Sequence, residues 1–147
     1  MSDLSEVATN IHRLSTVLGR VADRTLQDSY GYGMSQFKIL WMLYKHSEGV
    51  LQTNIAGWLN QTEAAVSRQI RLLNDQGLLS VEVDPENRRN HVVVLSETGR
   101  LFAQNAMKIL LKEYEPFFAD LDEKDMQKLN ELLEKIFIKV TTVCKEI

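Results

Sequence analysis

The segment QTEAAVSRQIRLLNDQG, residues 61–77, decides the fold of this 147-residue chain. At about 100° per residue, Val66, Ile70 and Leu73 fall within one narrow arc of a helix. The opposite arc holds small and polar residues: Ala64, Arg68, Arg71 and Asp75. Gly77 is suited to end the helix. The exposed N-terminal end of the helix holds Gln61, Thr62 and Glu63. The pattern predicts an amphipathic helix with one buried face and one exposed face.

A shorter helix is expected immediately before it, over residues 54–59. Thr53 is the expected N-cap of this shorter helix, and Thr62 is the expected N-cap of the longer one. Three apolar residues of the shorter helix face inward: Ile55, Ala56 and Leu59. Because residues 60–61 leave room only for a tight turn, the two helices form a helix-turn-helix arrangement.

A β-hairpin is expected directly after the second of these helices. Residues 81–83 and 91–95 have strand character, and the polar run DPENRRN, residues 84–90, joins them as an exposed tip. A hairpin in this place is a wing. The arginines of its tip, Arg88 and Arg89, suit the narrow minor groove of DNA, where negative potential is concentrated.

The exposed face of residues 61–77 has the chemistry of a helix that enters the major groove. Small Ala64 lets the backbone approach DNA, Ser67 can donate or accept a hydrogen bond, and arginine binds either guanine or phosphate. The candidate DNA-binding residues are Thr62, Ala64, Ser67, Arg68, Arg71, Arg88 and Arg89. Solvated arginines on an ordinary helix and loop are the alternative, but the order of helix, turn, helix and hairpin favours DNA binding.

Charge limits the kind of DNA binding to expect. The net charge is -3, and residues 61–95 carry four arginines against five carboxylates. Non-specific affinity comes mainly from neutralised phosphates, so the charge argues against indiscriminate binding to nucleic acid, and we expect modest non-specific affinity. Specific binding then depends on where the arginines project.

Long amphipathic helices are expected at both ends of the chain. An apolar stripe with steps of three and four runs along residues 4–28: Leu4, Val7, Ile11, Leu14, Leu18 and Val21. The last helix repeats the spacing: Met126, Leu129, Leu133, Ile136, Val140 and Val143. Packing within one subunit and pairing with a second copy are both compatible with such stripes.

Further helices are expected between these ends. One begins after Ser35 and runs to about residue 46, with an aromatic stripe for the core. Ser96 caps another that continues to about Tyr114, before Pro116, and residues 120–125 begin the last helix. The predicted fold class is mainly α with a small β-hairpin wing, in which a winged helix-turn-helix core is flanked by long terminal helices.

Composition excludes several classes of protein. No run approaches the roughly 18 apolar residues that span a bilayer, and the start lacks a leader pattern, so we expect no membrane partner and a cytoplasmic location. The single cysteine, Cys144, cannot build a disulfide framework or a cysteine zinc cluster. His12, His46 and His91 lack the spacing of metal ligands, and there is no glycine-rich phosphate loop. We therefore expect no metal, no cofactor and no enzymatic activity.

Residues 34–100 resemble the DNA-binding core of the multiple-antibiotic-resistance regulator (MarR) family of winged-helix transcription factors. The matching runs are MSQFKILWML, TNIAGWLNQTEAAVSRQIRLLNDQGLL, DPENRR and VVVLSETG. In that family the termini interlock as a dimer. The resemblance implies a dimerisation helix over residues 1–33, a DNA-binding domain over 34–96, and C-terminal helices over 97–147 that complete the dimerisation region.

The resemblance also implies roles for particular residues. The recognition helix would contact the major groove, and Arg89, with Arg88 beside it, would enter the minor groove. The family's usual wing signature is Asp-Arg-Arg, whereas this chain has Asn87 before the arginines, so a neutral hydrogen bond replaces a charged one in orienting the wing. Some members bind small aromatic acids between the dimerisation helices and the winged domain. The candidates for such an effector pocket are His12, Tyr30, Tyr32 and Trp41.

Two functions remain open from the sequence. The first is a homodimeric, sequence-specific repressor of transcription that binds a pseudo-palindromic operator in double-stranded DNA and is relieved by a small effector. The alternative is a winged-helix protein-interaction module that does not bind DNA. The acidic balance and Asn87 support this alternative.

Overall fold

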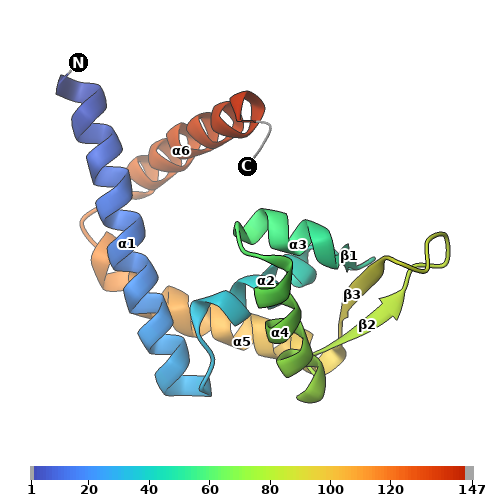
Figure 1. The fold of residues 1–147 in the computed structure, drawn as a ribbon. Coiled ribbons are helices and arrows are strands. Elements are labelled where there is room, and N and C mark those ends of the chain that lie inside the picture. The colour runs from blue at the N-terminus through green and yellow to red at the C-terminus, as the bar shows by residue number, and fades with distance from the viewer. Residues whose placement is uncertain (1, 145–147) are drawn as a thin grey trace.

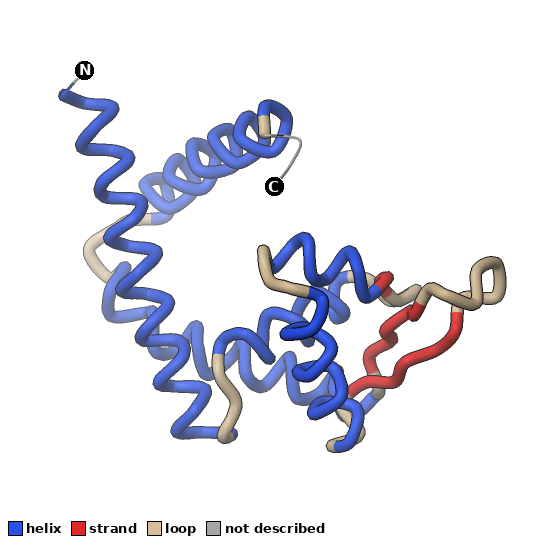
Figure 2. The backbone as a smooth tube through the Cα atoms, viewed as in Figure 1, coloured by secondary structure: helices blue, strands red, loops and turns tan. Residues whose placement is uncertain are grey.

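The computed structural model describes residues 2–144 as a helical chain with one small sheet (Figure 1). The elements in chain order are α1 (Ser2–Tyr30), α2 (Met34–Lys45), β1 (Val50–Leu51), α3 (Gln52–Leu59), α4 (Glu63–Asp75), β2 (Leu79–Val83), β3 (His91–Leu95), α5 (Glu97–Tyr114), the 3-10 helix η1 (Glu115–Phe118) and α6 (Glu123–Val143). Figure 2 shows the strands gathered at one end of the molecule, with α1 at the other end. The predicted fold class is confirmed.

The winged helix-turn-helix is built around one apolar core. Side chains from α2, α3, α4, the sheet and α5 meet in it: Ile39, Leu40, Met42, Leu43, Ile55, Ala56, Val66, Ile70, Leu73, Leu78, Leu79, Val93 and Ala103. Val66, Ile70 and Leu73 supply the contribution of α4, as their spacing predicts. This core holds α4 against the rest of the domain and leaves its other face to solvent.

A second, smaller core joins α1 to the winged helix. Ala22 and Leu26 of α1 are fully buried against Phe37 of α2 and Ala106 and Leu110 of α5. Only the C-terminal half of α1 takes part. The division of the chain into three regions stays a prediction, because the two cores share the helices α2 and α5.

The sheet has the strand order β1-β3-β2, with both pairs antiparallel. β2 and β3 form the predicted hairpin, and β2 begins two residues earlier than the strand pattern alone indicates, at Leu79. Val81 lies opposite Val93, and Val83 lies opposite His91. These four residues therefore share one face of the sheet.

Two predicted helix starts are wrong. α3 begins at Gln52 with Leu51 as its N-cap and no side-chain cap, so Thr53 lies inside the helix. The reason is that Leu51 ends β1, paired with Val92, and the chain passes from strand to helix without a linker. α2 begins at Met34 rather than after Ser35, because the carboxylate of Asp23 in α1 accepts the Met34 backbone N–H at 2.8 Å.

The predicted stripe of α6 is uncovered, and so is the α1 stripe from Leu4 to Leu14, whereas Leu18 and Val21 are half-buried. Every residue of α6 is exposed, and so are the residues of α1 from Asp3 to Val17. In Figure 1, α6 and the N-terminal half of α1 lie apart from the helix-turn-helix and the wing. Within residues 2–144, no helix has the length and apolar character needed to cross a membrane.

Candidate nucleic-acid interface

The α4 helix has well-defined ends that follow from its sequence. The Thr62 hydroxyl accepts the Ala65 backbone N–H at 3.2 Å, as expected of an N-cap. At the other end, Gly77 takes a φ of 72°, and the Leu78 N–H donates to the Leu73 carbonyl at 3.0 Å. These bonds form a Schellman motif, which turns the chain directly into β2.

The outer face of α4 carries the residues that the sequence assigns to DNA. Thr62, Ala64, Arg68 and Arg71 are exposed, and Ser67 is half-buried. The outer face therefore combines a small residue, two long cations and hydroxyl groups, which is the chemistry that base edges and phosphates require. Whether these side chains touch DNA stays a prediction.

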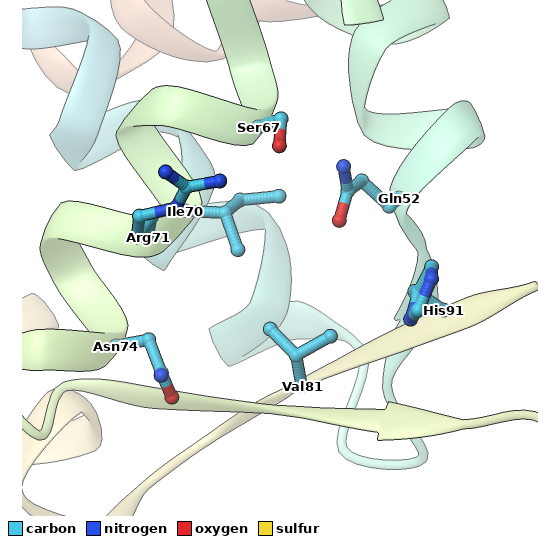
Figure 3. Close-up of a pocket in the computed structure, with 7 residues that line it drawn as sticks. All are labelled: Gln52, Ser67, Ile70, Arg71, Asn74, Val81 and His91. Atoms are coloured by element: carbon cyan, nitrogen blue, oxygen red, sulfur yellow. The ribbon is translucent and has the colours of Figure 1, made fainter. Parts of the chain in front are cut away.

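A cavity of about 300 Å³ separates α4 from the wing (Figure 3). Ser67, Ile70, Arg71 and Asn74 line it from α4, Val81 and His91 from the sheet, and Gln52 from the first turn of α3. Figure 3 shows the Arg71 guanidinium and the Gln52 amide approaching this space from opposite sides. Asn74, Gln52 and His91 are polar groups at the candidate interface that sequence reasoning did not select.

Asparagine and aspartate side chains shape the tip of the wing. The side-chain carbonyl oxygen of Asn87 accepts the Arg89 backbone N–H at 3.1 Å. A carboxylate oxygen of Asp84 accepts the Glu86 backbone N–H at 2.9 Å. A further backbone bond, from Asp84 N–H to the Asn90 carbonyl, closes the loop. The bond that Asn87 makes is thus to the backbone of Arg89, so asparagine retains the turn that presents the two exposed arginines.

None of the four arginines of α4 and the wing has an ionic partner in the part of the chain that the structure describes. The ion pairs there are Arg24–Asp28 in α1 and Lys128–Glu131 in α6. Arg68, Arg71, Arg88 and Arg89 are all exposed. Their charges are therefore available to phosphates, even though the whole chain is acidic.

A chain of amides links α4 to α2 across the turn of the helix-turn-helix. The side-chain amide of Gln69 in α4 donates to the side-chain carbonyl oxygen of Gln61 at 3.2 Å. The side-chain NH₂ group of Gln61 donates to the Ser35 hydroxyl at 3.5 Å. The expectation that Gln61 belongs to the exposed end of the helix is wrong, because the residue is half-buried and its amide faces this network. The side-chain carbonyl oxygen of Gln69 is buried without a hydrogen-bond partner. Such an orphaned group costs stability.

Replacing Gln69 with methionine should therefore stabilise the domain and weaken DNA binding together. Methionine removes the orphaned oxygen, which should raise the free energy of unfolding by about 1 kcal/mol. It also removes the donor that holds Gln61, so the start of α4 is less fixed and DNA affinity should fall a few-fold. Urea unfolding and a DNA titration measure the two effects. Ser35→Ala is the control, since it leaves the orphaned oxygen in place; a less stable Gln69→Met protein would contradict this account.

Among residues 2–144, His12 lies apart from Tyr30, Tyr32 and Trp41, which pack against the two cores. His12 is exposed on the N-terminal half of α1, in a surface depression with Arg13 and Arg20. Tyr30 and Tyr32 both contact the Phe102 ring, with centroids 4.7 and 5.2 Å away, whereas Trp41 stacks on Phe37 and Tyr44. Their joint role in binding an effector stays a prediction.

Tyr32 connects the end of α1 to the end of α4. Its hydroxyl donates to the side-chain carbonyl of Gln76, the C-cap residue of α4. Burial raises the pKa of the Tyr32 hydroxyl above its ordinary value of 10.0, so the group stays a donor at neutral pH. Tyr32 therefore links the segment after α1 to the C-cap of α4.

Comparison with known proteins finds the same architecture in regulators of transcription. The model of the MarR family matches residues 33–91, which run from the start of α2 to the start of β3. The HTH-type transcriptional regulator TcaR of Staphylococcus aureus (strain Newman) is 26% identical over 121 residues, covering 81% of this chain and 79% of TcaR.

Solved structures share the whole fold at low sequence identity. The transcriptional regulator BldR from Sulfolobus solfataricus aligns with a TM-score of 0.82 at 18% identity, over 93% of this chain and 96% of BldR. CouR from Rhodococcus jostii RHA1, solved with bound p-coumaroyl-CoA, aligns with a TM-score of 0.73 at 18% identity, over 88% and 90% of the two chains. At such identities the likeness concerns the fold.

Proposed function

This chain belongs to the MarR family of transcriptional regulators through residues 33–91, and from that premise we propose that it represses transcription as a homodimer on a pseudo-palindromic operator. It is a DNA-binding regulator with the winged helix-turn-helix of that family. A dimer that occupies both the major and the minor grooves of its site would exclude other proteins from the same DNA. We propose that it acts in this way in the cytoplasm.

The uncovered terminal helices support the homodimer. An isolated helix gains little stability from its own hydrogen bonds, so a helix of 21 residues normally depends on packing of its apolar face. α6 buries none of its residues in its own chain, yet its stripe repeats every three and four positions. Large contiguous apolar faces are rare on monomers. A second copy, whose α1 and α6 carry the same stripes, offers a matching surface.

The symmetry of such a dimer determines how it would meet DNA. Two recognition helices related by a two-fold axis read successive major grooves, about one helical turn apart. Each wing then extends to the flanking minor groove. The half-sites of the operator should accordingly be inverted copies of each other.

The observation that carries DNA binding is the set of unpaired arginines on α4 and the wing. Arg68, Arg71, Arg88 and Arg89 are exposed and have no carboxylate partner among residues 2–144. A mobility-shift titration against the DNA that flanks the protein's own gene tests it. We expect a specific shift that weakens as salt rises. No specific shift at low salt would favour the protein-interaction module instead.

Replacing Arg89 with alanine should weaken operator binding and reduce its dependence on salt. A wing arginine in the minor groove neutralises about one phosphate charge, so the slope of log affinity against log salt should fall by about one. The measurement is an anisotropy titration at several salt concentrations. The Arg88→Ala variant tests the neighbouring arginine in the same titration. The Lys112→Ala variant is the control, because it removes one positive charge from an exposed position on α5, away from the wing. An unchanged slope for Arg89→Ala would remove the wing from the mechanism.

A small aromatic effector is proposed to relieve DNA binding. CouR, which shares the fold, was solved with p-coumaroyl-CoA, a ligand with an aromatic ring. In this chain Tyr30 and Tyr32 surround Phe102 beside the junction of α1 and the winged helix, and Tyr32 also contacts Gln76 at the end of α4. A ligand that displaced these rings would move the recognition helix. His12 and Trp41 stay candidates for the remaining contacts.

A further inference from the structure

A carboxylate stands at the leading end of α4. Glu63 is the first residue of this helix, and its side chain is exposed. The N-cap hydroxyl of Thr62 already accepts the Ala65 N–H, so the helix is capped without help from Glu63. Within residues 2–144 the Glu63 side chain takes part in no hydrogen bond and no ion pair. The fold therefore gives this carboxylate no internal partner.

Glu63 lies on the side of α4 that faces the wing. Ser67 and Arg71 follow it at intervals of four residues, and both line the cavity between α4 and the wing. Glu63 itself borders a smaller cavity of about 100 Å³ at the start of the helix, which Arg89 of the wing also borders. From its N-terminal end, this side of α4 thus presents an acceptor, then a hydroxyl, then a charged donor.

Two positive features lie near the Glu63 carboxylate. The N-terminal end of a helix carries a partial positive charge, which favours a carboxylate in the first turn. Arg89, exposed and without an ionic partner in residues 2–144, borders the same small cavity. Together they offset the repulsion that the phosphates of a bound DNA would exert on Glu63.

The edges of the base pairs decide which base suits a carboxylate in this place. A recognition helix enters the major groove with its N-terminal residues toward the base edges. There cytosine presents an amino donor without an acceptor beside it, whereas guanine and thymine present acceptors and adenine presents one of each. An acceptor would repel the carboxylate. Cytosine is therefore the base that fits Glu63 best.

We propose that Glu63 is a specificity-determining residue, whose carboxylate accepts a hydrogen bond from the N4 amino group of a cytosine in each half-site. This inference rests on the proposed DNA-binding function and deepens it. Glu63 selects by exclusion as well as by attraction, because a base that presents acceptors leaves its charge unpaired beside the phosphates. The exposed arginines attract the phosphates of any sequence, whereas Glu63 penalises the wrong one.

The first test selects bound sequences from random DNA with the wild type and with Glu63→Gln, and then titrates both on operators that differ by one base pair. The wild type should prefer cytosine at one position in each half-site, with other bases about 10-fold weaker. Glu63→Gln should shift that position toward adenine, which pairs bidentately with glutamine, and leave the other positions unchanged.

Asp75→Asn is the matched control for charge. It removes one exposed carboxylate from the other end of α4, so it should strengthen binding to all sequences equally. If Glu63→Gln also strengthens binding to all sequences equally, with no change in base preference, Glu63 acts only through its charge and the proposal is overturned.

A modified base tests the hydrogen bond itself. N4-methylcytosine pairs with guanine but carries a methyl group in place of the amino hydrogen that faces the major groove. The wild type should lose about 10-fold in affinity for an operator with this base, whereas Glu63→Ala should bind the modified and unmodified operators equally. Thermal unfolding checks that the variants are folded.

Two results of this second test separate the inference from the proposed function. Equal sensitivity of Glu63→Ala and the wild type to the methyl group would overturn the role of Glu63 while leaving DNA binding intact. A wild-type protein that binds no operator would overturn the proposed function and this inference with it.

Discussion

Replacing Ile136 with glutamate is expected to leave the protein monomeric and to lower operator affinity by at least about 100-fold. Ile136 lies in the middle of the α6 stripe and is 43% exposed in the single chain. In a dimer that covers this stripe, a glutamate would place an unpaired charge in an apolar interface, at a cost of several kcal/mol. Separation of the two recognition helices then removes the gain from binding two half-sites at once, which is roughly 100-fold or more.

Sedimentation and operator titration of the Ile136→Glu protein measure these two losses. Gln127→Glu is the matched control, since it adds the same side chain to the same helix on the side away from the stripe. We expect it to remain dimeric. An Ile136→Glu protein that is still a dimer with normal affinity would show that α6 is not part of the interface.

Replacing Gly99 with alanine should destabilise the fold by about 3 kcal/mol or more. Gly99 is buried in the first turn of α5, where a β-carbon would lie 1.8 Å from the Leu78 carbonyl oxygen. That oxygen also accepts the Ser96 N–H at 3.1 Å, and the Ser96 hydroxyl donates to the Gly77 carbonyl at 2.6 Å. The end of α4 and the start of α5 are therefore held together, and neither can move aside without breaking bonds.

Thermal and urea unfolding measure this effect. Gly19→Ala is the matched control, because the same substitution in the middle of α1 meets no atom within 4 Å. It should stabilise the helix by up to about 1 kcal/mol, since alanine is the better helix former. Equal stability of the Gly99→Ala protein and the wild type would contradict the close packing of α5 on Leu78.

The recognition helix was predictable because its determinants are local. The Thr62 cap, the spacing of Val66, Ile70 and Leu73, and the terminal Gly77 all lie within one segment, and each behaves in the structure as the sequence indicates. The hairpin was predictable for the same reason. Its polar tip lies between two β-branched runs, and the strands pair across it.

Starts of helices that depend on distant partners were not predictable. Leu51 is held by Val92, 41 positions away in the sequence, and the Met34 N–H is bound by Asp23 of another helix. Thr53 is a good local cap, and tertiary pairing overrides that preference. Gln61 was assigned to the exposed end of α4 for a similar reason, since its partner Gln69 lies eight residues further on.

The grouping of Gln52, Asn74 and His91 around the cavity between α4 and the wing could not be read from the sequence at all. Gln52, Asn74 and His91 belong to three different elements, and no spacing among them marks a site. Their common position arises because α3, α4 and β3 pack around one core. The arginines were easier to select, because exposure at a helix face or a loop tip is a local property.

Selection of bound sequences from a random pool of DNA tests the central claim most directly. The homodimeric regulator proposed here should enrich a pseudo-palindrome whose half-sites are about one helical turn apart, with flanking positions that favour a narrow minor groove. Pools that show no enrichment at low salt, or that enrich one unrepeated half-site, would contradict it.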